Sequence, residues 1–175
     1  KTTLAKKLSE TLHLDVLLEA AENNPFLARF YRQPEQYALS TQLSFLLQRA
    51  QQVQDIRQSD MFQVSRVADF MIDKDRMFAE ITLNSDELKL YNQIYDHLTL
   101  DAPKPDLVIY LQAPVDILRE RISKRAIDYE QSIKHDYLSR LSESYTRFFY
   151  DYNDSALLTV NNGAVDLINN DQDYQ

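Results

Sequence analysis

The chain has 175 residues, 44% of them hydrophobic and 26% charged, and a formal net charge of −8. This size and composition predict one soluble globular domain over residues 1–175. They exclude a disordered or membrane-spanning chain, because no apolar run reaches about 18 residues. An acidic chain lacks the basic surface that a nucleic-acid backbone requires, so we expect neither a nucleic-acid nor a membrane partner. The absence of cysteine excludes disulfides and thiolate metal sites and favours a cytoplasmic location.

The first residues are Lys1, Thr2 and Thr3, and a helical pattern runs from Thr2 to Leu12. A lysine and a hydroxyl residue directly before a helix are typical of the end of a phosphate-binding loop. In that loop glycine N–H groups surround the phosphates, the lysine reaches the β- and γ-phosphates and the hydroxyl ligates Mg²⁺. The glycines would precede Lys1, so we expect the chain to be truncated before its first strand and loop. Three residues alone are more often only a polar helix start.

The elements that follow alternate between strands and helices. Short apolar runs predict strands over residues 14–18, 62–70, 106–111 and 156–160. Helical spacing predicts helices over residues 26–31, from 34 for about 25 residues, from 73, from 85 (capped by Ser85) to 98, and over 116–124 and 130–152. The nearly continuous apolar run at 106–111 is typical of a strand covered on both faces, and the tail is expected to fray. The alternation predicts a parallel αβα sandwich.

Two acids follow predicted strands. Glu19 comes directly after the strand at 14–18, and Asp69 lies at the end of the strand at 62–70. Ligands of a parallel sheet bind at the carboxyl ends of its strands. An acid at that edge, beside a phosphate loop, can accept the proton of an attacking hydroxyl. For either acid alone, a helix cap or a solvated carboxylate is the more frequent role.

A basic run follows the strand at 106–111. Arg119, Arg121, Lys124 and Arg125 lie at or near the end of a predicted helix, where cations complement the helix dipole. The alternative is a cationic lid whose guanidinium groups stabilise a transferring phosphoryl group. Glu130 fits neither the basic run nor the core, and could accept a hydrogen bond from a sugar hydroxyl.

Gln42 and Arg49 interrupt the apolar face of the long helix. They are seven residues apart, so they lie two turns apart on one face. A ligand would explain both, although a solvated helix face remains an alternative. The three histidines, at 13, 97 and 135, show no metal-ligand spacing.

Several segments cover nearly the whole chain in a fixed order: Asn24 to Leu27, Phe30 and Tyr31, Pro34 to Tyr37, Gln42, Arg49, Asp69, Lys74 to Ala79, Lys104 to Val108 and Arg121 to Glu130. Together they resemble the deoxynucleoside kinase family and its bacterial deoxyadenosine/deoxyguanosine kinase branch. The resemblance implies a P-loop kinase that moves the γ-phosphate of ATP, with Mg²⁺, to the 5′-hydroxyl of a deoxynucleoside in nucleotide salvage.

The resemblance also implies roles at the site of phosphoryl transfer. Asp69 matches the general base, and Lys1, Thr2 and Thr3 fall in the ATP-binding loop. Glu19 matches an acid near the 5′-hydroxyl and, with Thr2, near the metal. Two further residues match lid arginines that contact ATP and assist catalysis, namely Arg121 and Arg125.

The substrate-binding residues implied by the resemblance belong to two groups. Tyr31 and Glu130 match the pair that holds the 3′-hydroxyl of the deoxyribose. Gln42 matches the amide that binds a base edge, and Arg49 with Asp75 matches a pair typical of purine and cytosine kinases, which disfavours thymidine.

The chain departs from the family pattern at two points. Phe70 follows Asp69 where many relatives have arginine, so a neighbouring cation would come from Lys74 or Arg66. The lid usually contains a glycine and a further arginine, and this chain has Ala126 and Ile127 in their place.

Two alternatives to the kinase interpretation remain. A nucleoside monophosphate kinase related to thymidylate kinase would need cations facing its acceptor phosphate, whereas the pocket predicted here suits a neutral nucleoside. A non-catalytic partner subunit would keep the fold and a dimer face. We expect a homodimer in which the helix from Glu35 and the helix over Glu130–Tyr152 meet their counterparts, because the apolar stripe of the first helix is broad.

Overall fold

The computed structural model describes residues 1–59, 65–98, 102–168 and 170–174. Its α-helices are α1 (Thr2–Leu12), α2 (Leu27–Arg32), α3 (Pro34–Ser59), α4 (Asp73–Thr82), α5 (Ser85–Leu98), α6 (Val115–Arg125), α7 (His135–Asp151) and α8 (Asp171–Tyr174). Two 3₁₀ turns are η1 (Ala21–Asn23) and η3 (Asp128–Ser132). The strands are β1 (Asp15–Leu17), β2 (Arg66–Ala68), β3 (Leu107–Gln112) and β4 (Ala156–Asn161). The predicted alternation of strands and helices is confirmed.

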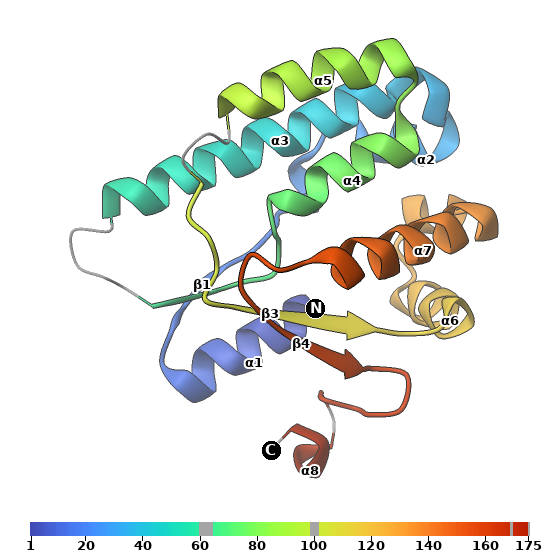
Figure 1. Cartoon of the computed structure of the whole chain (residues 1–175). Coiled ribbons are helices and arrows are strands. Elements are labelled where there is room, and N and C mark those ends of the chain that lie inside the picture. The colour runs from blue at the N-terminus through green and yellow to red at the C-terminus, as the bar shows by residue number, and fades with distance from the viewer. Residues whose placement is uncertain (60–64, 99–101, 169, 175) are drawn as a thin grey trace.

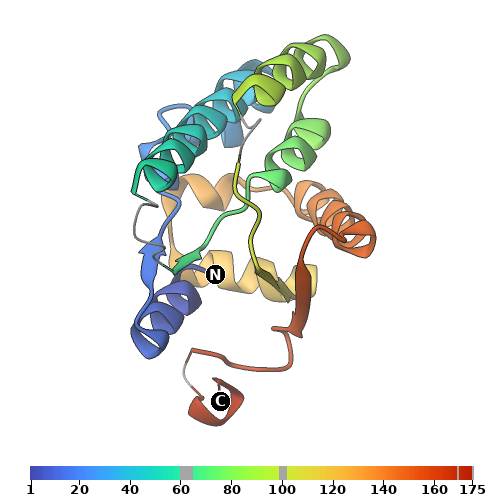
Figure 2. The same ribbon diagram turned by 60° about the vertical axis from the view of Figure 1, so that its left-hand side comes forward.

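The strands form two parallel pairs. β1 pairs with β2, with Asp15 opposite Arg66, and β3 pairs with β4, with Leu107 opposite Ala156. Within the described residues no ladder joins the two pairs. The strands lie between α1 on one side and α3, α4 and α5 on the other (Figures 1 and 2). This arrangement confirms a parallel αβα fold; residues 62–64 of the second predicted strand lie outside the described residues.

The prediction that the strand at 106–111 is covered on both faces is wrong for part of that strand. The first residue of β3, Leu107, is 53% exposed, and Val16 in β1 is 38% exposed. Helix α7 covers β3 at Tyr110, whose ring stacks on Tyr145 and Phe149, and this cover does not extend to Leu107 at the start of the strand.

The helix α1 packs against β1 and β2 and buries Leu4 and Ala5. It ends at His13, which has the left-handed value φ = 54°, and the Ser9 hydroxyl then donates a hydrogen bond of 2.6 Å to the Leu14 carbonyl. The turn leads directly into β1, which therefore runs back along α1. The beginning of α1 and the end of β1 thus lie at the same edge of the sheet.

Helices α3, α4 and α5 form an apolar cluster. Leu46, Ala79, Tyr91 and Tyr95 are its buried members. Pro34 begins α3, as its fixed φ favours at the first position of a helix. One boundary differs in detail: Asn84, rather than Ser85, caps α5. The Asn84 side chain accepts hydrogen bonds from two N–H groups of the first turn, and its own N–H donates to a glutamate carboxylate in that turn, which is a capping box.

The C-terminal part contains two corrections. The helix predicted from Glu130 begins at His135, because the backbone is extended at Ile133 and Lys134 and separates α7 from η3, which contains Glu130. The tail expected to fray forms α8, which is held against α1: Lys7 lies 3.2 Å from an Asp171 carboxylate oxygen, and the Tyr174 hydroxyl donates to Thr11 over 2.8 Å. No described helix is long and apolar enough to cross a membrane.

Candidate active site

Two acids meet at the carboxyl ends of β1 and β2. The Asp69 N–H continues the ladder by donating to the Leu17 carbonyl over 3.1 Å. The Glu19 N–H then donates to Asp69 Oδ1 over 2.6 Å. Asp69 is 7% exposed. Parallel pairing therefore brings together two acidic residues that are 50 residues apart in the sequence.

The beginning of α1 faces these acids. The Thr2 hydroxyl donates a short hydrogen bond to Asp69 Oδ2. The Lys1 ammonium donates to Glu19 Oε2 over 2.6 Å and to the Asp69 carbonyl over 2.8 Å. Thr3 is exposed in the first turn of α1. The N-terminus of α1, which no side chain caps, thus lies beside both carboxylates.

Arg49 connects the acids to the long helix. One of its terminal nitrogens forms a short ion pair with Glu19, and the other lies 2.5 Å from Asp75 Oδ1. The guanidinium side chain is 11% exposed and lies over the Phe45 ring. Burial raises the pKa of Asp75 to about 6, although the Arg49 charge and hydrogen bond oppose that rise.

Lys74 adds another cation to this cluster. Its ammonium donates to the Tyr145 hydroxyl over 3.3 Å. Burial lowers its pKa to about 8, as does the charge of Arg49, while Asp75 and Asp69 oppose the shift. Burial also lowers the pKa of Lys1 to about 8, and among the neighbouring charges Lys74 lowers it most. Arg66, the other candidate cation, begins β2 at the end opposite Asp69.

Gln42 on α3 is buried, with 6% of its surface exposed. Its side chain has no hydrogen-bond partner among the described residues. At the preceding residue, the buried Asn24 amide donates to the Thr41 carbonyl over 3.0 Å, which fixes the loop before α2 against α3. With so little of its surface exposed, Gln42 does not lie on a solvated helix face.

Tyr31 and Glu130 lie in neighbouring elements. The Tyr31 ring stacks on Tyr129 in η3, with ring centroids 6.1 Å apart and an interplanar angle of 6°. Burial raises the pKa of the Tyr31 hydroxyl, and the charge of Glu130 contributes to the rise. Glu130 itself forms an ion pair of 2.9 Å with Arg125. These contacts bring the predicted sugar-binding pair next to one of the predicted lid arginines.

The second predicted lid residue points elsewhere. The Arg121 guanidinium donates to the Asn162 carbonyl, after β4, over 2.7 Å. Its exposed position at the surface allows it to leave that contact. Ala126 occupies the left-handed region at φ = 52° and ends α6 in the place where the family pattern has glycine.

A family model of deoxynucleoside kinases matches residues 1–175. The chain belongs to the deoxynucleoside kinase family. It is 34% identical to the deoxyguanosine kinase of Bacillus subtilis, over 100% of this chain and 87% of that protein. It is 29% identical to the deoxyadenosine kinase of Lactobacillus acidophilus, over 97% of this chain and 84% of that protein.

A solved structure supports the same fold for this kinase. The deoxyadenosine kinase of M. mycoides with bound dATP matches it with a TM-score of 0.82 at 22% identity, over 94% of this chain and 86% of that one. The predicted family, the P-loop kinase fold and phosphoryl transfer to a deoxynucleoside are therefore confirmed. The matches do not favour a monophosphate kinase or a non-catalytic partner subunit.

Two residues beside the candidate site were not predicted from the sequence. Gln48 and Gln52 on α3 donate hydrogen bonds to the carbonyls of Ala20 and Leu18, on either side of Glu19. Their spacing of four residues, flanking Arg49 on one helix face, was the available indication. Glutamines are common on solvated faces, so the pattern alone does not identify them.

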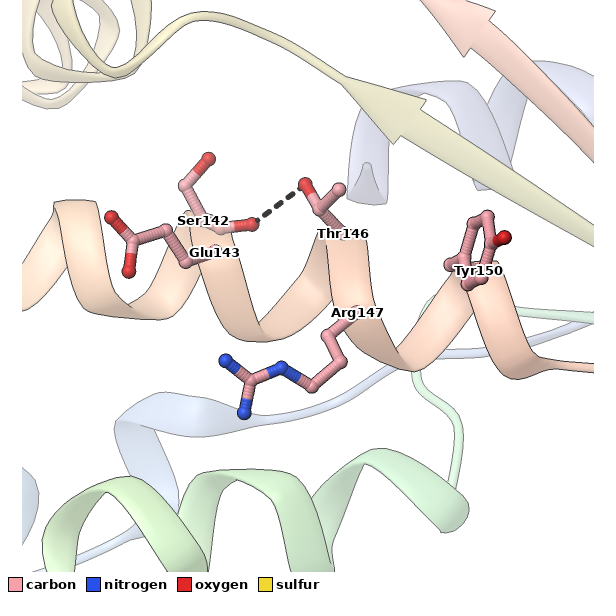
Figure 3. A pocket seen from close by; sticks show the side chains of 5 residues that line it. All are labelled: Ser142, Glu143, Thr146, Arg147 and Tyr150. Atoms are coloured by element: carbon pink, nitrogen blue, oxygen red, sulfur yellow. Dashed lines mark hydrogen bonds between the residues drawn. The ribbon is translucent and has the colours of Figure 1, made fainter.

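Two cavities of this kinase lie away from the site, along α7. The first, of about 350 Å³, is lined by Ser142, Glu143, Thr146, Arg147 and Tyr150. Figure 3 shows that all five side chains come from α7 and that Thr146 bonds back to the Ser142 carbonyl one turn earlier. The second, of about 440 Å³, lies between α4 and the end of α7. Neither contains a predicted site residue, so we assign no substrate to them.

Proposed function

We propose that this kinase transfers the γ-phosphate of ATP to the 5′-hydroxyl of deoxyadenosine or deoxyguanosine, with Mg²⁺, in nucleotide salvage. The observation that carries the proposal is the cluster at the end of β2. There a buried Asp69 is held by Thr2 and by the Glu19 N–H beside Lys1. The names of the relatives support the choice of purine deoxynucleosides.

Asp69 is the proposed general base. Its carboxylate accepts the proton of the 5′-hydroxyl while that oxygen bonds to the γ-phosphorus and the bond to the leaving ADP oxygen breaks. Two hydrogen bonds already fix the carboxylate, so it needs little reorganisation. Lys1 neutralises the phosphoryl oxygens, and Lys74 is the proposed additional cation beside Asp69.

ATP is proposed to bind at the N-terminus of α1. The unpaired N–H groups of the first turn, including those of Thr2 and Thr3, suit phosphate oxygens, and the side chain of Lys1 adds a charge. Arg121 and Arg125 are proposed to close over the phosphates after exchanging their present partners, the Asn162 carbonyl and Glu130.

The oxygens near Lys1 fit a magnesium ion. Thr2 Oγ1 donates to Asp69, and the Glu19 carboxylate lies 2.6 Å from the Lys1 ammonium; hydroxyl and carboxylate oxygens are both hard ligands. Mg²⁺ usually takes one or two protein carboxylates and completes its shell with phosphates and water, so it needs no larger cluster. Thr2 and Glu19 would hold the ion, which would supply positive charge to neutralise the phosphate oxygens.

The nucleoside is proposed to lie along α3. Gln42 offers one donor and one acceptor to a base edge. Arg49 suits the two acceptors of guanine, and Asp75 can accept a hydrogen bond from the amino group of adenine. Thymine has an acceptor oxygen where adenine has that amino group, so a carboxylate disfavours it. Tyr31 and Glu130 are proposed to hold the 3′-hydroxyl.

We propose a homodimer formed through α3 and α5. These helices pack together (Figure 1). Each exposes a leucine, Leu47 at 56% and Leu90 at 46%. The second helix expected at this interface, now α7, is separated from α3 by α4, which packs against both. Light scattering at micromolar concentration tests the assembly, and a monomer contradicts it. We also propose a cytoplasmic location, because the reaction uses ATP as its donor.

Substrate specificity tests the function most directly. The full-length enzyme is assayed with ATP and Mg²⁺ against four deoxynucleosides and their monophosphates. We expect deoxyadenosine or deoxyguanosine to give the highest kcat/KM. Thymidine or any monophosphate as the best substrate contradicts the proposed pocket, and no turnover with any compound supports the partner-subunit alternative.

A further inference from the structure

Leu17, the last residue of β1, and Glu19, two residues later, both form backbone hydrogen bonds toward β2. The Leu17 carbonyl accepts from the Asp69 N–H, and the Glu19 N–H donates to the Asp69 carboxylate. In an extended chain the backbone groups of successive residues point to opposite sides. The carbonyls of Leu18 and Ala20 therefore point away from β2, beyond the ladder and without a strand partner there.

Two glutamines of α3 bond to these carbonyls. Gln52 Nε2 donates to the Leu18 carbonyl over 3.0 Å, and Gln48 Nε2 donates to the Ala20 carbonyl over 3.2 Å. The spacings match: four residues of a helix rise about 6 Å, and two residues of an extended chain rise about 6.6 Å. From Leu18 to Ala20, one face of α3 therefore supplies the hydrogen-bond donors that a neighbouring strand would supply.

Arg49 lies between the two glutamines in the sequence and contacts the residue between the two carbonyls. Its guanidinium pairs with the Glu19 carboxylate, which also accepts from Lys1 over 2.6 Å. One face of α3 therefore holds both the backbone around Glu19 and its charge. A change in either amide would move the carboxylate relative to Lys1.

We propose that Gln48 and Gln52 are positioning residues for phosphoryl transfer, which act by fixing Glu19 beside Lys1. The inference rests on the proposed role of Glu19 near the 5′-hydroxyl. A displacement of about 1 Å in a reacting assembly can lower the rate by up to about 10²-fold, so two hydrogen bonds remote from the substrate can have a measurable effect.

The test removes each amide while keeping the length of the side chain. Gln48→Met and Gln52→Met are compared with Gln51→Met in the full-length enzyme. Gln51 lies on the same helix, and among the described residues its exposed amide bonds only to the Asp55 carboxylate, over 2.9 Å. We expect kcat/KM for a purine deoxynucleoside to fall about 3- to 10-fold in the first two variants and to stay within about 2-fold in the control. Equal effects in all three variants would overturn the proposal.

A double-mutant cycle with Glu19→Gln separates positioning from a general structural role. If the glutamines act through Glu19, Gln52→Met lowers kcat/KM by less than about 2-fold once the Glu19 charge is gone. If the double variant loses the product of the two single-variant fold-changes in kcat/KM, Gln52 does not act through Glu19, and the inference is overturned.

Hydrogen exchange supplies a measurement that does not depend on turnover. We expect the Glu19 amide to exchange faster in Gln48→Met and Gln52→Met than in the wild type, and unchanged exchange in Gln51→Met. Unchanged exchange in the first two variants contradicts positioning, even if their activity falls. If Glu19→Gln leaves turnover intact, the proposed role of Glu19 fails, while this exchange measurement still decides whether the glutamines hold it.

Discussion

The transfer site and the base pocket are both buried and polar, but their hydrogen bonding differs. Around Asp69, each side-chain oxygen has a donor, from Thr2 or from the Glu19 N–H. The base pocket, which α3 and α4 contribute, is less complete: within the described residues Gln42 has no hydrogen-bond partner, and Asp75 Oδ2 and Arg49 Nε are buried without one. Satisfied groups stay in place without a ligand, whereas unsatisfied ones gain free energy when a ligand supplies the missing partners.

We therefore expect the transfer site to determine mainly the turnover rate and the base pocket to determine mainly the affinity for the nucleoside. Variants in the transfer site should lower kcat, because its groups are preorganised for the reaction. Variants in the base pocket should lower kcat/KM and nucleoside affinity, because its groups are completed by the substrate. The four predictions below test this division, beginning with the largest expected effect.

Asp69→Asn is expected to lower kcat about 10²- to 10⁴-fold with little change in nucleoside binding. Asparagine keeps an oxygen for the Glu19 N–H but cannot accept the proton of the 5′-hydroxyl. Steady-state kinetics and calorimetric binding measure the two effects. Asp73→Asn, an exposed change at the start of α4, is the control and should stay within about 2-fold. Turnover near the wild-type value in Asp69→Asn would rule out this residue as the base.

Lys74→Met should lower kcat by about 10²-fold, as expected when a cation that stabilises developing charge is removed. Methionine fills the space, so folding should persist. Tyr145→Phe is the control: it removes the hydroxyl that accepts from Lys74 and leaves the ammonium in place. A loss in Tyr145→Phe as large as that in Lys74→Met would assign both residues to a structural network instead.

Sequence patterns identified most elements because their determinants are local. Pro34 begins α3 where its fixed φ favours a helix, and Glu19 and Asp69 follow strands whose parallel pairing brings them together. The failures depend on contacts distant in the sequence. Glu130 lies in a 3₁₀ turn rather than a helix, and the role of Gln48 depends on a carbonyl 28 residues away. No local pattern specifies such a partner.

Gln42→Ala should lower kcat/KM for purine deoxynucleosides by about 1–3 kcal/mol, the range for losing a buried hydrogen-bonding partner, with little change in Tm. The loss should appear mainly in nucleoside affinity, unlike that of Asp69→Asn. Gln51→Ala, an exposed change on the same helix, controls for altered helix propensity. If Gln42→Ala lowers kcat and spares affinity, the division between the two regions is wrong.

The smallest effect concerns the ionisation of Asp75. Burial raises its pKa to about 6, so protonation as pH falls through 6 weakens its pair with Arg49 and its acceptance of an adenine amino group. We expect kcat/KM for deoxyadenosine to fall about tenfold per pH unit below that value.

The ionisation of Asp75 should have the opposite effect on stability, because its contribution to the free energy of unfolding increases as the pH falls through the same range. The folded chain holds a proton that the unfolded chain releases near pH 4, so the free energy of unfolding contributed by Asp75 decreases as pH rises from about 4 to 6 and is constant above. Asp75→Asn should remove both dependences, and an acid limb that persists in that variant would assign it to another group.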